Sequence, residues 1–275
     1  MSYLGRTAMV LIMALPFSTA MAADLPTNMP APLPTAPAAP VSAPFSWTGF
    51  FAGANGGYSY GKSSNEFVLT SAFLSANVPD AIVNVDNAGS QSDVLRGGIF
   101  GIQAGYNYQV SDSFVLGAVA SGDYTNLNAS IHYVGALPTD AGGFAETLDQ
   151  SVSARWTSAL QAKIGFVPID RMLIYAIGGI AAGQIKYTNV YDNTANETEY
   201  TQTTKITPGW TAGAGIEYAF AKNWSLMAQY NFTDYRHVKS AGTALLSNGS
   251  IATTAHSTGA LKVNTFRVGL NYLLN

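Results

Sequence analysis

The stretch Trp210 to Phe220, WTAGAGIEYAF, alternates between two kinds of side chain at every step. Its even positions hold Trp, Ala, Ala, Ile, Tyr and Phe, and its odd positions hold Thr, Gly, Gly, Glu and Ala. A period of two is typical of a β-strand, because successive side chains point to opposite faces of a sheet. This segment is therefore predicted to be a strand with one apolar face and one face of small or polar side chains.

The same alternation recurs along the chain, most clearly in Trp156–Phe166 and Phe266–Leu274. It predicts eight strands, at residues 47–60, 94–108, 114–125, 152–167, 172–187, 206–220, 224–237 and 262–274. Three connections are short, near Ser111-Asp112, Pro168–Asp170 and Lys222-Asn223. Four are long, at residues 61–93, 126–151, 188–205 and 238–261. Short turns at one end and long loops at the other are typical of outer-membrane barrels, and an even number of strands puts both chain ends on the short-turn, periplasmic side.

The composition favours a sheet in contact with lipid. Charged residues make up 11% of the chain and hydrophobic residues 48%, whereas a soluble domain has about 25% charged residues. Lipid offers no hydrogen bonds to the backbone, so a spanning sheet has to close on itself. We therefore predict an all-β fold, an eight-stranded antiparallel up-and-down transmembrane β-barrel. The alternative, a soluble sandwich or lipocalin-like barrel, needs a charged surface that this composition does not supply. Aromatic side chains near strand ends are expected to form the interfacial girdles: Trp47, Tyr58, Tyr108, Trp224 and Tyr272.

The N-terminal segment is predicted to direct export. Residues 1–22 combine Arg6, the apolar run Ala8–Leu15 and the small-x-small site Ala20-Met21-Ala22, which together indicate a cleaved signal peptide. The apolar run is too short to be a membrane anchor, which needs about 20 residues. Residues 23–45 are rich in Pro and Ala and predict a disordered spacer. The barrel is then expected to occupy residues 46–275.

Few residues suggest catalysis, metal binding or a cofactor. The chain has no Cys and a net charge of −3, which argues against thiolate metal sites and nucleic-acid binding. The three histidines, His132, His237 and His256, lack partners at metal-ligand spacing, so no metal and no cofactor are expected. Asp234, His237 and Ser240 could be considered as a catalytic triad. The sequence shows no third group that would activate them, so the simpler interpretation is that they are polar residues where a strand meets a loop.

The charges predicted to face the interior form the main candidate site. Lys163, Glu217 and Arg267 all fall on the face opposite the lipid, as do Gln161 and Gln229. A charge at membrane depth needs a partner or water. We therefore expect a polar network in the lumen, with Glu217 as the shared acceptor for Lys163 and Arg267, which either plugs the barrel or lines a thin pore.

Several stretches carry a resemblance to a known family. They are SWTGFFAGANGGYSYG from Ser46, Gln103–Asn107, Gln161–Gly165, Tyr175–Gly179, Gly209–Tyr218 with Asn223–Leu226, and Phe266–Tyr272. In order and spacing the chain resembles the small outer-membrane immunogenic proteins of the porin family, RopB-type proteins with an OmpA-like barrel. Two departures are the non-aromatic end, Leu274-Asn275, where such barrels usually end in an aromatic residue read during assembly, and Gln229, where the family often has Glu.

The resemblance implies a location in the cell outer membrane, surface exposure and immunogenicity. We expect a non-enzymatic barrel with a structural and surface-display role. The alternatives are a small pore for ions or solutes, an adhesin or receptor acting through residues 61–93 and 238–261, and, last, an outer-membrane lipid enzyme. The expected partners are outer-membrane lipid and lipopolysaccharide, the barrel-assembly machinery during biogenesis, and host or phage surfaces at the loops.

Overall fold

The computed structural model describes residues 45–71, 75, 79–136, 145–193, 198–245 and 251–274. The predicted signal peptide and all of the predicted spacer except Phe45 lie outside these residues. None of the described helical residues belongs to a helix long and apolar enough to cross a membrane. The elements with defined bounds are β1 (Gly49–Ser71), α2 (Pro79–Gly89), β2 (Ser92–Ser111), β3 (Phe114–Ala136), β4 (Ala145–Ile169), β5 (Met172–Asn193), β6 (Thr198–Ala219), β7 (Trp224–Leu245) and β8 (Ile251–Leu274).

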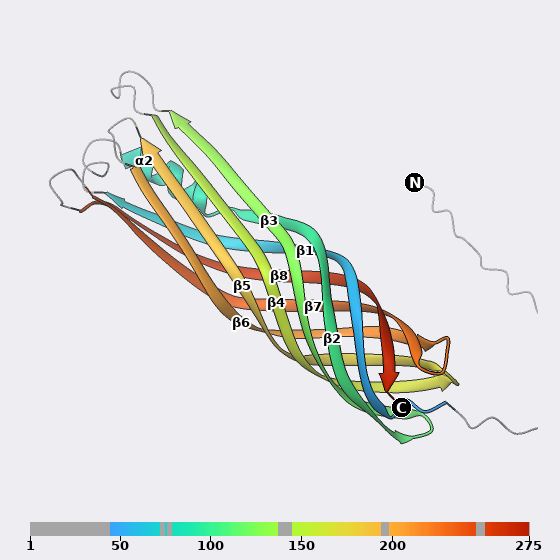
Figure 1. Ribbon diagram of the computed structural model, residues 1–275. Coiled ribbons are helices and arrows are strands. Elements are labelled where there is room, and N and C mark those ends of the chain that lie inside the picture. The colour runs from blue at the N-terminus through green and yellow to red at the C-terminus, as the bar shows by residue number, and fades with distance from the viewer. Residues whose placement is uncertain are drawn as a thin grey trace, which may run out of the picture. The chain divides into compact units, whose positions relative to one another are not determined.

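The strands form a closed antiparallel barrel in chain order, and this confirms the predicted fold (Figure 1). The ring closes where β8 pairs with β1, from Phe50 opposite Leu274 to Ser71 opposite Thr253. Short turns at residues 112–113, 170–171 and 220–223 lie at the same end as Leu274. The helix α2 lies at the opposite end of the barrel.

The strands are longer than the sequence predicted. They contain 20 to 25 residues, although about 9–11 suffice to cross a membrane. The prediction that residues 61–93, 126–151, 188–205 and 238–261 are long loops was wrong for most of their length. In β1 the strand continues to Ser71 rather than ending at residue 60, and α2 follows within what was predicted to be loop.

Two levels of aromatic contacts mark the part of the barrel that spans the membrane. The lower girdle contains Phe50–Tyr106, Phe114–Phe166 and Trp224–Tyr272, with ring centroids 4.8, 5.7 and 5.1 Å apart. The upper girdle contains Tyr60–Phe266, Tyr124–Trp156 and Trp210–Phe232, at 6.4, 5.3 and 5.4 Å. Phe50 and Tyr60 lie ten positions apart on β1. At about 3.3 Å per residue and a tilt of about 45°, ten positions rise roughly 23 Å, which matches the apolar band of an outer-membrane barrel.

Trp47 does not belong to a girdle, contrary to the prediction. Its side chain is 1% exposed and packs with Phe51, Val115 and Leu173 inside the periplasmic end of the barrel. The backbone N–H of Trp47 donates to Oε1 of Gln109 at 2.9 Å. The segment before β1 thus fills the lower opening instead of extending along the membrane interface.

Above the upper girdle the barrel reverses its polarity. Its outward side chains become polar, as with Lys62, Asn126 and Asp192, while an apolar cluster fills the interior. The buried members of that cluster are Leu95, Leu127, Val152, Ala154, Ala181, Ile185, Tyr187, Tyr235, Leu261 and Val263. The outer half is therefore built like a water-soluble barrel, and the inner half like a membrane barrel.

Register shifts occur on three strands at this transition, beside Tyr124, Ala154 and Tyr235. In β4 the shift between Ala154 and Trp156 leaves Arg155 and Trp156 both exposed. Even positions face inward above this bulge, and odd positions face inward below it. A bulge adds one residue to a strand and turns the side chains beyond it to the opposite face. In β4 this switch occurs at the level where the interior changes from polar to apolar.

The helix α2 closes the outer end. Val85 is buried against Phe67, Leu69, Leu148 and Tyr191. The N–H of Leu69 donates to Oδ1 of Asp86 at 2.7 Å, which ties the helix to β1. Gly89 permits the close approach, because a Cβ there would lie 2.6 Å from Cγ of Phe67.

Candidate functional site

The five predicted interior residues all lie buried on the inner faces of the strands, between the two girdles. Lys163 and Gln161 come from β4, Glu217 from β6, Gln229 from β7 and Arg267 from β8. They meet many further polar side chains there, so the lumen is lined by amides and hydroxyls as well as by charges. The alternation explains this placement, because each residue falls on the face opposite its lipid-facing neighbours.

Lys163 and Glu217 form a buried ion pair in the lower part of the lumen. Nζ of Lys163 lies 3.4 Å from Oε2 of Glu217, and the two side chains are 3% and 1% exposed. Oε1 of Glu217 also accepts hydrogen bonds from Ser225 Oγ at 2.6 Å and Asn271 Nδ2 at 2.7 Å. The ammonium group lies 4.8 Å from the ring centre of Phe51 and 4.5 Å from that of Tyr175. Both charges are therefore compensated although both have left water.

Arg267 does not share Glu217, contrary to the prediction. Its Nη1 instead lies 3.2 Å from Oδ2 of Asp123 on β3, and this second ion pair is also buried. Glu217 stands opposite Met227 on β7, and Met227 stands opposite Gly269 on β8. Arg267 lies two residues above Gly269 on β8, and therefore above the level of Glu217. This offset brings the guanidinium to Asp123. The sequence analysis missed Asp123, although it has the inward parity of the predicted strand 114–125.

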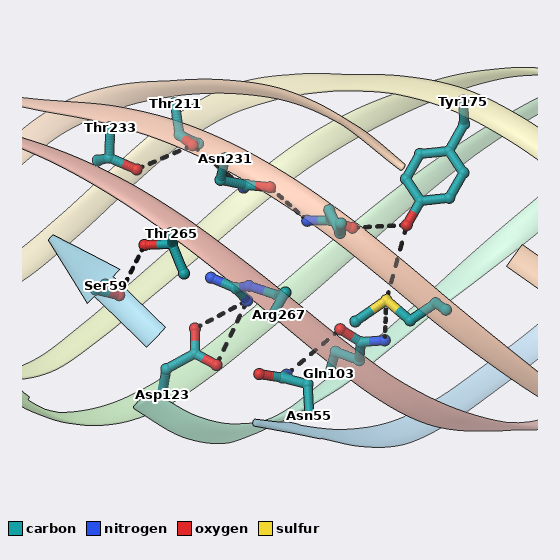
Figure 2. A network of polar contacts seen from close by, with 12 residues as sticks. Asn55, Ser59, Gln103, Asp123, Tyr175, Thr211, Asn231, Thr233, Thr265 and Arg267 are labelled. Carbon is teal, nitrogen blue, oxygen red and sulfur yellow. Dashed lines mark hydrogen bonds and ion pairs between the residues drawn. The ribbon is translucent and has the colours of Figure 1, made fainter. Parts of the chain in front are cut away.

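Hydrogen bonds of amide side chains connect the Lys163–Glu217 pair to the rest of the lumen, and Figure 2 shows part of this network beside the separate Arg267–Asp123 pair. Gln103 Nε2 donates to Asn271 Oδ1 at 2.7 Å, and Asn271 in turn donates to Glu217. On the other side of the lumen, Tyr175 donates to Gln229 Oε1 at 2.8 Å, and Gln229 Nε2 donates to Asn231 Oδ1 at 2.6 Å. Gln161 lies on the same inner face, and its Nε2 has no hydrogen-bond partner among the described residues.

Side chains fill the lumen at successive levels. The cavity between Asp123, Arg267, Ser59 and Thr211 has a volume of about 30 Å³, which is the space of about one water molecule. Below the network lies the apolar cluster of Trp47 and Phe51, and above it the apolar cluster of the outer half. In the part of the chain that the structure describes, packed side chains therefore occupy the lumen at each of these levels.

Two buried carboxyl groups lie near the outer end, above the membrane-spanning segments. The hydroxyl of Tyr191 donates to Oε2 of Glu146 at 3.3 Å, and Thr201 donates to Glu199. Burial raises the pKa of Glu146 to about 7, against the weaker lowering effect of the Tyr191 hydrogen bond. Burial also raises the pKa of Glu199. Both groups are thus held in a setting that disfavours their charged form.

The geometry of Asp234, His237 and Ser240 is not defined, because the side chains of His237 and Ser240 lie outside the described residues. His256 is exposed on β8. His132 Nδ1 lies 2.5 Å from Oδ1 of Asp149 on the outer surface of β3 and β4, and both side chains are largely exposed. The described residues contain no group of three or more acidic or histidine side chains able to hold a metal ion.

Comparisons with known sequences agree with this architecture. A model of the family described as outer membrane protein beta-barrel domain matches residues 31–273. The 31 kDa outer-membrane immunogenic protein of Brucella melitensis is 35% identical, over 95% of this chain and 96% of that protein. The 25 kDa outer-membrane immunogenic protein of the same organism is 27% identical, over 94% and 92%. The crystal structure of Neisserial surface protein A is 12% identical with a TM-score of 0.38, and the match covers 82% of this chain and 98% of that one.

Proposed function

The chain belongs to the outer membrane protein beta-barrel domain family, and from this premise we propose that it is a non-enzymatic barrel that strengthens the envelope and displays its outer half at the cell surface. It is located in the cell outer membrane, as the sequence predicted. The relatives are named immunogenic outer-membrane proteins rather than enzymes. A surface antigen needs a folded part outside the membrane, and the polar-faced outer half of this barrel supplies one.

The filled lumen is the observation that carries a structural role over the pore. Two buried ion pairs, from Lys163 to Glu217 and from Arg267 to Asp123, cross the interior between the girdles. Ions and small solutes need a continuous wet path, and an eight-stranded barrel has an interior that side chains can fill completely. A channel would require this network to rearrange.

Surface display predicts which positions can be labelled on intact cells. The chain has no Cys, so a single introduced thiol is unique. Val134 is 63% exposed on the outer part of β3, and Val134→Cys should react with a membrane-impermeant maleimide on intact cells. Lys222 is exposed in the turn between β6 and β7, and Lys222→Cys should react only after the outer membrane is opened. If Lys222→Cys were labelled on intact cells and Val134→Cys were not, the barrel would have the opposite orientation in the membrane.

Binding of host or phage surfaces by the outer half is the second candidate. It is favoured by the length of the strands, which continue well past the upper girdle; β3, for example, extends twelve residues beyond Tyr124 to Ala136. Strands of this length carry their outer ends away from the lipid, where a large partner can reach them. Adhesion measured with the wild-type chain and with a chain that lacks residues 79–89, inside the expected binding segment 61–93, tests this candidate.

A further inference from the structure

Positive charges gather just above the upper girdle on the outside of the barrel. The side chains that form this basic belt are Lys62, Arg96, Arg155, Lys186 and Lys262, from β1, β2, β4, β5 and β8. Farther out, the outward faces of the described strands carry acidic side chains instead, at Glu66, Asp149 and Asp192. The basic residues are therefore concentrated at one level, which is where a membrane would meet water if the girdles mark its borders.

The belt is densest where β8, β1 and β2 lie side by side. Lys62 and Lys262 are directly opposite each other across the β1–β8 pair, and both are exposed. Opposite positions on neighbouring antiparallel strands have Cβ atoms about 5 Å apart. Arg96 stands opposite Tyr60, one outward position below Lys62, and is also exposed. Three cations thus share one small patch of surface, directly beside the stacked rings of Tyr60 and Phe266.

Nearby acidic residues do not balance this patch. Like charges directly opposite each other in a sheet are destabilising. Asp234 stands opposite Lys262 on β7, and Glu66 lies two outward positions beyond Lys62 on β1. Among the described residues, neither carboxylate forms a salt bridge with any of the three cations. The arrangement keeps a net positive charge that an external anion can neutralise.

We propose that Lys62, Lys262 and Arg96 form a binding site for the phosphate groups of a lipid in the outer leaflet, lipid A being the chemical class that carries them. The aromatic rings immediately below contact the acyl region, and the ammonium and guanidinium groups above contact the phosphates. A guanidinium group binds phosphate through two parallel hydrogen bonds, and lysine binds it as a point charge. This inference rests on the membrane placement in the proposed function and adds a defined lipid site to it.

The test titrates the refolded full chain in detergent with diphosphoryl lipid A and with the same lipid lacking both phosphates. The wild-type chain should bind the phosphorylated form more tightly, and rising salt should weaken that binding. Lys62→Gln with Lys262→Gln should weaken it about thirtyfold, as expected for two cations near a charged lipid surface. Arg96→Gln alone should weaken it severalfold.

The matched control removes the same charge at the other end, with Arg171→Gln and Lys222→Gln at the periplasmic turns, and should bind like wild type. Retention of the folded band on unboiled gels establishes that each variant is still a barrel. Equal binding of the two lipids by the wild-type chain, or unchanged binding by the Lys62 and Lys262 double variant, would overturn the proposal. Displacement of lipid A by inorganic phosphate as readily as by free lipid A would also overturn it. A failure of the proposed topology would appear in the thiol-labelling pattern and not in this titration.

Discussion

Lys163 and Glu217 form the least exposed ion pair in the described part of the molecule, and their neighbours explain how both charges are kept. Glu217 has three donors, and Lys163 lies against two aromatic rings. Glu217→Gln should therefore destabilise the barrel by about 3 kcal/mol, because it leaves the lysine buried without its counter-charge. Adding Lys163→Met should recover part of that loss.

A double-mutant cycle on the free energy of unfolding in detergent measures this coupling. Positions 163 and 217 should couple by more than about 1 kcal/mol, whereas positions 217 and 267 should be nearly additive, because Arg267 pairs with Asp123. A larger coupling between 217 and 267 than between 163 and 217 would contradict the arrangement of the lumen.

Glu146 should make the stability of the outer half depend on pH. Its pKa of about 7 in the folded protein exceeds the ordinary value of 4.5, so the folded state holds the proton more tightly than the unfolded state. The contribution of Glu146 to the free energy of unfolding should be largest below about pH 4.5, fall as the pH rises to about 7, and change little above that, with a total loss of about 1–3 kcal/mol.

Urea unfolding midpoints at pH 5 and pH 8 test this dependence. Glu146→Gln should reduce the difference between the two midpoints, with a remainder from Glu199, whose pKa is also raised. Glu66→Gln, which changes an exposed carboxylate on β1, is the control and should keep the wild-type difference. An unchanged difference in the Glu146 variant would show that this carboxyl group is not the titrating one.

At the scale of single elements, α2 is held by one apolar contact face together with the hydrogen bond from the N–H of Leu69 to Asp86. Val85 is buried in the outer end, whereas Val83 two residues earlier is 56% exposed. Val85→Asp should release the helix, because an unpaired carboxylate would have to be buried among Phe67, Leu69 and Tyr191. Added protease should then cleave near α2 on intact cells, while the barrel keeps its resistance to SDS.

Val83→Asp is the matched control, since it places the same charge on the exposed side of the same helix. It should leave the protease sensitivity at the wild-type level. Equal cleavage of both variants would mean that the charge itself, rather than the loss of packing, exposes the helix.

The lower half of every strand could be predicted from the sequence, and the upper half could not, for a physical reason. Below the upper girdle the large apolar side chains face outward, as in Trp210–Phe220, and the period of two is plain. Above it the apolar residues face inward, as with Phe67, Leu148 and Tyr191, and the outward positions resemble loop residues. The bulge beside Trp156 also breaks the alternation of β4, so the apolar, lipid-facing side that is clear in Trp156–Phe166 does not continue through Ala154.

For the candidate site, the sequence predicted which residues face the lumen but not how they pair. Parity alone placed Lys163, Glu217 and Arg267 in the lumen, but the pairing of Arg267 depends on strand offsets that only the closed barrel defines. The helix α2 could not be predicted from its sequence, PDAIVNVDNAG, because several of its residues have low helix propensity. The helix is stabilised instead by the packing of Val85 against the barrel. Trp47 was misplaced because an aromatic residue at a strand end fits a girdle and a plug equally well.

At the scale of the whole molecule, one continuous barrel joins two environments. The membrane-spanning half has apolar side chains outside and a polar network inside, and the outer half has the opposite arrangement. Both arrangements fill the interior, with the cluster of Trp47 at the lower end and α2 at the upper end. The lumen of this outer-membrane barrel is therefore expected to be blocked to ions and small solutes along its length.

Conductance of the refolded protein in a planar lipid bilayer tests that claim most directly. Insertion should produce no stepwise current under moderate voltage, because the ion pairs and both apolar clusters block the lumen. Asp123→Ala with Arg267→Ala, which empties the middle of the network, should leave the membrane insulating as well, since the apolar clusters remain. Reproducible conductance steps from the wild-type protein would contradict the closed barrel and favour the small pore.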